Sequence, residues 1–315
     1  MSPHVTSAAA RRALAGDPAL AARHAPPSLP DNWPNRSFSR IVDAAGIHWH
    51  VQRHGSGPGL LLVHGTAAST HTWRAMLPAL AESYEVLAMD LPGHGYSERL
   101  PDGSMSLPSL ASALAELLGR EGFHPRCAVG HSAGVAIVLR AVLDGAMHPS
   151  VIVGVNAALM PFGGGLRKLF EPMARLLANT HLISSLLARR ARDVGAVKRM
   201  LKGTGSTLDE QGLALYQHLL SSERHIQAVL AMMASWDLQP LLTDLPALKT
   251  PLHLIVGARD KAVSPREADS IAALADNVRV TRLPGLGHLA HEENPGLFVE
   301  LVAQSCPPAE PVADG

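Results

Sequence analysis

The residues best placed to do chemistry are Gly-His-Ser-Ala-Gly at 130–134, where a serine stands between two glycines. In this pattern the serine must occupy a turn so tight that only small residues fit two positions before and after it. The apolar run at 126–130 predicts a strand before Ser132, and residues 132–143 have the pattern of a helix after it. Such a turn would present Ser132 as a nucleophile, although a glycine-rich turn could also carry a serine without any chemical role.

A serine hydroxyl is a weak nucleophile near neutral pH, so Ser132 needs a histidine as general base and a carboxylate to orient that histidine. Asp260 and His288 each come one short loop after a predicted strand, at 251–256 and 278–283. Because the carboxyl ends of parallel strands meet at one edge of a sheet, the three side chains are expected at the same edge. Ser132, Asp260 and His288 are therefore the predicted nucleophile, acid and base.

The sequence contains seventeen histidines, so other partners for the serine have to be weighed. His291 lies three residues after the predicted base and is its main rival, although a pocket or surface position is favoured for it. The strand at 150–156 ends in Asn156, the other position at which the acid could stand. An amide bears no charge to stabilise an imidazolium, which favours Asp260 as the acid.

Acyl transfer also needs hydrogen-bond donors aimed at the oxygen that becomes negatively charged. The predicted donors are the backbone N–H groups of Ala133, directly after the nucleophile, and of Thr66, in the loop that follows the strand at 59–64. Many turns of this type carry a bulkier residue where this chain has Ala133. The small side chain could leave room for a large substrate, or it could simply pack well, and both explanations stay open.

Short apolar runs alternate with helical patterns over most of the chain, which predicts a mostly parallel sheet covered by helices on both sides. The predicted strands lie at 38–43, 47–53, 59–64, 85–90, 126–130, 150–156, 251–256 and 278–283. The predicted helices outside the insertion described next lie at 70–81, 107–121, 132–143, 265–275 and 295–302. Eight strands of this kind, with the chain order serine, acid, histidine, are typical of the α/β-hydrolase fold.

The alternation stops after the sixth predicted strand, where residues 157–245 have helical patterns and no strand-like run. A helical insertion at this point predicts a cap over the carboxyl ends of the strands, where such sheets place their sites. The core is then expected at 35–156 and 246–305. Residues 1–34 predict an N-terminal arm that ends in several prolines, and residues 306–315 predict a disordered tail.

Composition narrows the classes of function. With 315 residues, of which 47% are hydrophobic and 17% charged, the chain can bury a large core, and its formal net charge of zero argues against nucleic acid as a partner. Cys127 and Cys306 are too few for a disulfide framework, so a reducing, cytoplasmic setting is expected. The sequence shows no secretory signal, no apolar run of about 18 residues and no metal-ligand spacing. Neither a metal nor an organic cofactor is expected.

The predicted cap carries a strong local charge. Between residues 166 and 202, two acidic residues, Glu171 and Asp193, oppose nine basic residues, for a net charge of +7: Arg167, Lys168, Arg175, Arg189, Arg190, Arg192, Lys198, Arg199 and Lys202. Apolar residues at helical spacing accompany them: Leu169, Phe170, Met173, Leu176 and Leu177. Such a segment could contact an anionic membrane or a partner protein, or bind the two propionates of a porphyrin. A solvated basic face would explain the same charges.

Between the cap and the sheet the sequence predicts an apolar pocket for the substrate. The residues assigned to its wall are His131, Leu159, Met160, Phe162, Met233, Trp236 and Leu289, with Met232 as a further candidate. Methionines suit this role because they adapt to large or irregular ligands. Each of these side chains could instead fill the core of the cap, and His131 could pack beneath the turn.

Several longer motifs resemble one particular family. They are Asn-Trp-Pro at 32–34, Trp-His-Val-Gln at 49–52, His-Gly-Thr at 64–66, Gly-Thr-Gly-Ser at 203–206, Met-Met-Ala-Ser-Trp-Asp-Leu at 232–238 and Gly-Leu-Gly-His-Leu-Ala-His-Glu at 285–292. Together, over residues 32–303, they resemble the BchO family of magnesium-chelatase accessory proteins in bacteriochlorophyll biosynthesis, which are α/β hydrolases. The resemblance implies a bacterial cytoplasmic protein that acts near the insertion of magnesium into protoporphyrin, with magnesium-chelatase subunits among its candidate partners.

The residues and the resemblance together predict a serine hydrolase that cleaves an ester-like bond in an apolar substrate, which could be a tetrapyrrole. A peripheral position at the photosynthetic membrane would fit the basic cap. The alternative is an accessory protein that keeps the fold only to bind a tetrapyrrole or to support the chelatase. The complete set of serine, histidine and aspartate argues against a pure binding protein. A haloalkane dehalogenase is disfavoured because it would need an aspartate in place of Ser132.

Overall fold

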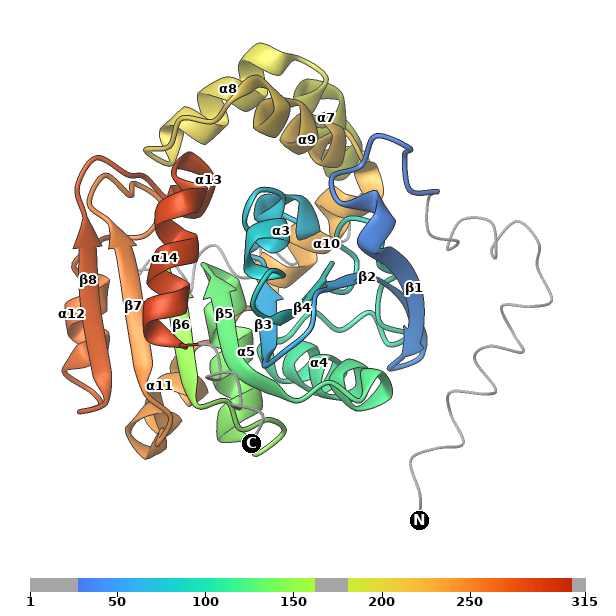
Figure 1. Cartoon of the computed structure of the whole chain (residues 1–315). Coiled ribbons are helices and arrows are strands. Elements are labelled where there is room, and N and C mark those ends of the chain that lie inside the picture. The colour runs from blue at the N-terminus through green and yellow to red at the C-terminus, as the bar shows by residue number, and fades with distance from the viewer. Residues whose placement is uncertain (1–27, 162–180, 308–315) are drawn as a thin grey trace.

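The fold is organised around one sheet of eight strands in the order β1-β2-β4-β3-β5-β6-β7-β8 (Figure 1). The strands are β1 (Ser39–Ala44), β2 (Ile47–His54), β3 (Gly59–Val63), β4 (Glu85–Met89), β5 (Pro125–His131), β6 (Val151–Val155), β7 (Leu252–Gly257) and β8 (Val278–Leu283). The structure is a computed structural model and describes residues 28–161 and 181–307. β2 pairs antiparallel with β1 and β4, and the other pairings are parallel, which confirms the predicted sheet.

The central strand β3 shows how helices are held to both faces of the sheet. The covering helices are α3 (Met76–Leu80), α4 (Leu107–Glu121), α5 (Ala133–Leu143) and α14 (Pro295–Ser305). Leu61 and Val63 pack into one apolar cluster with α4 and α5, while Leu60 and Leu62 pack into a second cluster with α3 and α14. All four side chains are fully buried, as expected for a strand covered on both sides.

The predicted helix at 70–81 is two short elements, η2 (Thr70–Trp73) and α3. The side chain of Ser69 caps η2, and the first N–H of η2 donates to buried Asp90 Oδ1 at 2.6 Å. These side-chain acceptors fix the first turn as a separate element, which apolar periodicity alone does not reveal. The remaining elements of the core are η1 (Arg36–Phe38), η3 (Leu245–Ala247), α12 (Glu267–Ala272) and α13 (Ala290–Glu293).

Between β6 and β7, the part of the chain that the structure describes forms helices and no strand. They are α7 (His181–Ala191), α8 (Val194–Gly203), α9 (Glu210–Leu220), α10 (Glu223–Ala234) and α11 (Gln239–Asp244). In Figure 1, α7, α8 and α9 lie above the sheet, on the side toward which β5, β7 and β8 point, which is the edge where a cap is predicted. α11 instead packs beside α5, with Leu241 in the core cluster, so the helices at that edge end before the predicted boundary at residue 245.

Some predictions concern residues outside the described ranges: the N-terminal arm up to residue 27, the tail from residue 308, Phe162, Arg167, Lys168, Leu169, Phe170, Glu171, Met173, Arg175, Leu176 and Leu177. Within those ranges, no helix is long and apolar enough to cross a membrane. The same residues contain no group of three or more histidines, cysteines and carboxylates placed to hold a metal. Cys127 and Cys306 are free and buried.

Candidate active site

Ser132 lies on the sharp turn between β5 and α5, with a φ of 52° and a ψ of −120°. A residue with a side chain stays in this left-handed region only where its surroundings hold it there. Ser132 N–H donates to Val155 O at 2.9 Å, which ties the turn to the end of β6. A Cβ on Gly130 would lie 2.7 Å from the backbone of α5. A Cβ on Gly134 would collide with the carbonyl oxygens of Val63 and His64, at the end of β3. Close packing therefore requires both glycines of the motif.

The structure brings the three predicted side chains together at the carboxyl edge of the sheet. His288 Nδ1 lies 2.7 Å from Asp260 Oδ2, and His288 Nε2 lies 3.1 Å from Ser132 Oγ. Because an ionised carboxylate can only accept, Nδ1–H donates to Asp260, and this leaves Nε2 to accept the hydroxyl proton. His291, the rival base, bonds Thr72 Oγ1 at 2.7 Å, and burial lowers its pKa to about 3. Ser132 is thus paired with His288 and not with His291.

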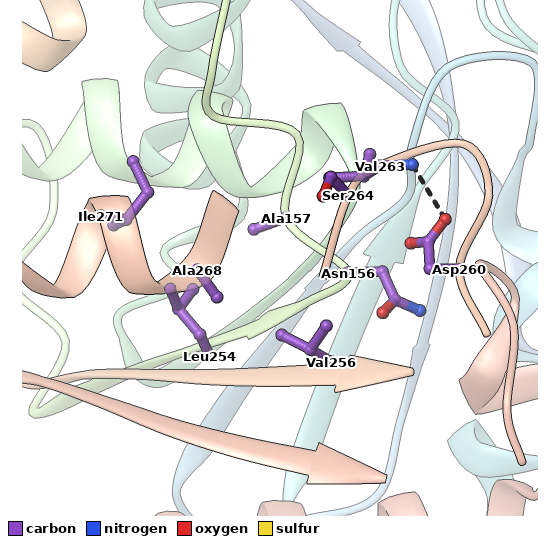
Figure 2. A pocket seen from close by; sticks show the side chains of 9 residues that line it. All are labelled: Asn156, Ala157, Leu254, Val256, Asp260, Val263, Ser264, Ala268 and Ile271. Carbon is purple, nitrogen blue, oxygen red and sulfur yellow. Dashed lines mark hydrogen bonds between the residues drawn. The ribbon is translucent and has the colours of Figure 1, made fainter. Parts of the chain in front are cut away.

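The carboxylate of Asp260 is held on both oxygens. Besides the bond from His288 to Oδ2, Oδ1 accepts from Ala262 N–H at 2.8 Å and from Val263 N–H at 2.9 Å, the second of which is drawn in Figure 2. Beside it lies a cavity of about 10 Å³ with a mostly apolar lining, to which β7 contributes Leu254 and Val256 and α12 contributes Ala268 and Ile271 (Figure 2). That volume is about one water molecule and cannot admit a substrate. These surroundings leave the carboxylate a single orientation toward His288.

Asn156, which was disfavoured as the acid, anchors the loop that carries His288, the predicted base. Its Nδ2 donates to Gly287 O at 3.0 Å and to His288 O at 2.7 Å, and its Oδ1 accepts from Gly257 N–H at 2.7 Å. His131 is buried, and its Nε2 donates to the same His288 carbonyl at 2.9 Å, so it is a second anchor of that loop. This positioning role of Asn156 was missed, although a polar residue directly after a buried strand is a signal for it.

Of the two residues predicted to bind the oxyanion, Ala133 directly follows Ser132 and Thr66 lies in a loop that packs against it. Ala133 is the first residue of α5, and N–H groups in the first turn of a helix have no partner within that helix. Thr66 belongs to the loop after β3, and this loop packs closely on the turn: a Cβ on Gly65 would lie 2.9 Å from Ser132 Cβ. Both N–H groups therefore come from segments that meet at Ser132, and their role stays a prediction.

The residues assigned to the pocket wall occupy different environments. Four are buried or half-buried apolar residues: Leu159, Met160, Trp236 and Leu289. Met233 is 55% exposed, whereas the neighbouring Met232 is buried and its sulfur accepts from Thr66 Oγ1 at 3.6 Å. Consecutive residues point about 100° apart around a helix, and in α10 it is Met232 that faces the loop of Thr66. Met232 is therefore the better placed of the two for the pocket wall, and the assignment of Met233 stays a prediction.

A larger cleft of about 560 Å³ is lined by residues of η2, α13 and the start of α9, with His291 among them. Its lining is mainly polar, unlike the predicted apolar pocket. Arg74 forms ion pairs there with Glu292 and with Asp209, the latter at 3.1 Å. Tyr216 donates to the same Glu292 at 2.8 Å. These charges are already satisfied by one another, and they tie α9 to the core.

Comparisons with known proteins show the family to which the chain belongs. The Alpha/beta hydrolase family matches residues 60–301 of the chain. The chain is 38% identical to the magnesium-chelatase 30 kDa subunit of Rhodobacter capsulatus over 269 residues, which cover 85% of this chain and 94% of that protein. It is 26% identical to the pimeloyl-[acyl-carrier protein] methyl ester esterase of Methylococcus capsulatus, over 81% of this chain and 98% of the esterase.

Among solved structures, an alpha/beta hydrolase fold protein from Burkholderia ambifaria is similar to the chain, with a TM-score of 0.71 and 22% identity. The similarity covers 85% of this chain and 97% of that one. At this identity the likeness speaks for the fold alone. The predicted α/β-hydrolase fold is thereby confirmed.

Asn156→Asp tests whether the amide positions the base. The carboxylate would face Gly287 O and His288 O without a proton to donate, so the free energy of unfolding should fall by about 1–3 kcal/mol. A displaced His288 should also slow the reaction of Ser132 with an organophosphorus reagent. Both quantities can be measured, by urea unfolding and by mass spectrometry of the modified serine.

Asn277→Asp is the matched control, because Asn277 Nδ2 also donates to two carbonyls, Leu248 O and Thr250 O, at the opposite end of β8. It should lose comparable stability without any change in the reaction of Ser132. Equal reaction rates for the Asn156 and Asn277 variants would contradict the positioning role.

Proposed function

The chain belongs to the α/β-hydrolase family and, within it, to the family of the magnesium-chelatase 30 kDa subunit, and we propose that it is a serine hydrolase. Ser132 is the nucleophile, His288 the general base and acid, and Asp260 the group that orients and stabilises the imidazolium. The observation that carries this proposal is the pair of hydrogen bonds from Ser132 to His288 and from His288 to Asp260, at 3.1 and 2.7 Å.

The proposed reaction is acyl transfer from an ester-like bond. Ser132 Oγ attacks the carbonyl carbon while His288 Nε2 takes its proton. The carbonyl oxygen becomes an oxyanion and accepts hydrogen bonds from the N–H groups of Ala133 and Thr66. His288 then gives its proton to the leaving oxygen, and an acyl group remains on Ser132. Attack by a water molecule, activated by the same His288, releases the acid and restores the serine.

The proposed substrate is apolar and could be a tetrapyrrole intermediate. Apolar side chains near Ser132 support an apolar substrate: Leu159, Met232 and Leu289 are buried there. The proposal of a tetrapyrrole rests on 38% identity to a protein named as a magnesium-chelatase subunit. From the same identity we infer a role beside that enzyme in the bacterial cytoplasm. Magnesium-chelatase subunits are accordingly the proposed protein partners.

The second candidate function is that of an accessory protein without catalysis. It is favoured by the name of the same relative, which describes a chelatase subunit and no hydrolase. In this case the fold would bind a tetrapyrrole or support the chelatase. The argument against it is chemical: binding an apolar ring requires neither a serine held at a φ of 52° nor a carboxylate bonded to histidine.

We also propose that the outer face of α7 and α8 contacts an anionic membrane surface. Leu182 and Leu186 lie one helical turn apart and are 82% and 65% exposed, and Leu187, Val194 and Met200 are exposed nearby. Six exposed basic residues accompany them: Arg189, Arg190, Arg192, Lys198, Arg199 and Lys202. Asp193 is the one acidic residue between 182 and 202. Apolar side chains surrounded by positive charge match a bilayer with anionic headgroups.

A fluorophosphonate probe tests the hydrolase proposal. Ser132 Oγ would displace fluoride from phosphorus as its proton passes to His288, so the wild type should be labelled at Ser132 alone. Ser132→Ala should give no label, and His288→Gln should react at least about 100-fold more slowly. His124→Gln, at an exposed histidine away from the site, should react at the wild-type rate. A folded wild type that binds protoporphyrin but takes no label would support the accessory protein instead.

Sedimentation with lipid vesicles tests the membrane contact. The protein should bind vesicles that contain phosphatidylglycerol and not vesicles of phosphatidylcholine alone, and salt should weaken the binding. The double variant Leu182→Asp, Leu186→Asp should bind these vesicles at least about tenfold more weakly than the wild type, because it places negative charges on the inserted face. Leu274→Asp changes an exposed leucine outside the helical insertion and should leave vesicle binding unchanged. Equal binding by both variants would exclude this surface.

A further inference from the structure

The motif at 203–206 approaches the candidate site from the helical insertion. Its residues Thr204, Gly205 and Ser206, here named the cap turn, follow α8 and lead toward α9. In Figure 1 the chain leaving α8 descends beside the loops that follow β7 and β8. These are the acid loop, residues 258–263, and the base loop, residues 284–289.

Hydrogen bonds join the cap turn to both loops. Thr204 O accepts from Lys261 N–H at 3.0 Å and from His288 N–H at 3.3 Å, so one carbonyl bridges the acid loop and the base loop. Ser206 is buried, and its Oγ accepts from Leu289 N–H at 2.8 Å. The backbone N–H groups of His288 and Leu289 therefore both donate to the cap turn.

The cap turn also packs on the two loops without any side chain between them. Gly205 has a φ of +86°, and a Cβ on it would collide with Arg259 O. A Cβ on Gly287 would in turn collide with the backbone of Gly205. Two glycines thus allow three backbone segments to meet directly. Arg259 and Lys261 flank Asp260, and Gly287 and Leu289 flank His288. The cap turn therefore contacts the residues on both sides of each catalytic candidate.

A further set of bonds fixes the start of α9 to the same place. Glu293 accepts from Thr207 N–H at 2.9 Å and from Gly287 N–H at 2.6 Å with its two carboxylate oxygens. Arg74 reaches Asp209 at 3.1 Å from the core. A displacement of α8 and α9 would therefore also displace the base loop, because the cap turn and Glu293 are hydrogen-bonded to both.

We propose that the cap turn is a positioning element that sets the hydrogen bond between Asp260 and His288, so that the placement of α8 and α9 controls the reactivity of Ser132. The inference rests on the proposed hydrolase function. A ligand or partner that moved these helices would change the rate at Ser132 without touching it. A misplacement of about 1 Å at a catalytic group can lower a rate about 100-fold, so a small displacement suffices.

Gly205→Ala tests this, with Gly203→Ala as the matched control one residue before the cap turn. The alanine at 205 has an unfavourable φ and must push the turn away from Arg259, whereas nothing lies within 4 Å of a Cβ at Gly203. Labelling of Ser132 by a fluorophosphonate should be about 10- to 100-fold slower in the first variant and unchanged in the second. The far-downfield proton NMR signal of the His288–Asp260 bond should shift or vanish in the first variant only.

Thermal unfolding and circular dichroism separate a local effect from loss of the fold. If Gly205→Ala does not fold, Ser206→Ala removes only the acceptor of Leu289 N–H and should slow labelling roughly fivefold. A folded Gly205→Ala, or Ser206→Ala in its place, with the wild-type rate and NMR signal overturns the inference and leaves the hydrolase proposal standing. A wild type that takes no label overturns the hydrolase proposal, and the NMR signal then decides the inference by itself.

Discussion

The hydrogen bond of 2.7 Å between His288 and Asp260 is the contact on which the rest of the site depends. It selects the tautomer of His288 and aims Nε2 at Ser132, and it requires two loops from neighbouring strands to keep a fixed distance. The surrounding bonds serve that requirement: Asn156 and His131 hold the carbonyl of His288, and backbone N–H groups hold the second oxygen of Asp260. All these groups lie at one edge because β5, β6, β7 and β8 are neighbours that run parallel and end there.

The sequence predicted the parts of this site that depend on local spacing. Glycines two residues on either side of Ser132 are needed wherever a strand turns this tightly into a helix, so the pattern carries its own structural explanation. The central strands were predictable for a similar reason, because continuous apolar runs such as Leu60–Val63 suit a strand covered on both faces. The family resemblance, drawn from longer motifs, agrees with the 38% identical relative.

Contacts between distant segments were beyond such reasoning. Nothing local distinguishes Met232 from Met233, since the answer depends on how α10 is rotated against the loop of Thr66. The anchoring role of Asn156 requires the positions of Gly257 and His288, which lie more than a hundred residues away. The break in the helix at 70–81 depends in part on Asp90, a residue from another strand end. In each case the deciding partner is set by the tertiary fold.

The central claim is that chemistry at Ser132, and not the fold alone, serves the pathway of the chelatase relative. The most direct measurement replaces the native gene with the Ser132→Ala variant in a bacterium that makes bacteriochlorophyll, and quantifies magnesium protoporphyrin at equal protein level. The account predicts a clear loss of magnesium protoporphyrin, as severe as that caused by deleting the gene. Wild-type amounts in the Ser132→Ala strain, together with a loss in the deletion strain, would contradict it and assign the function to binding.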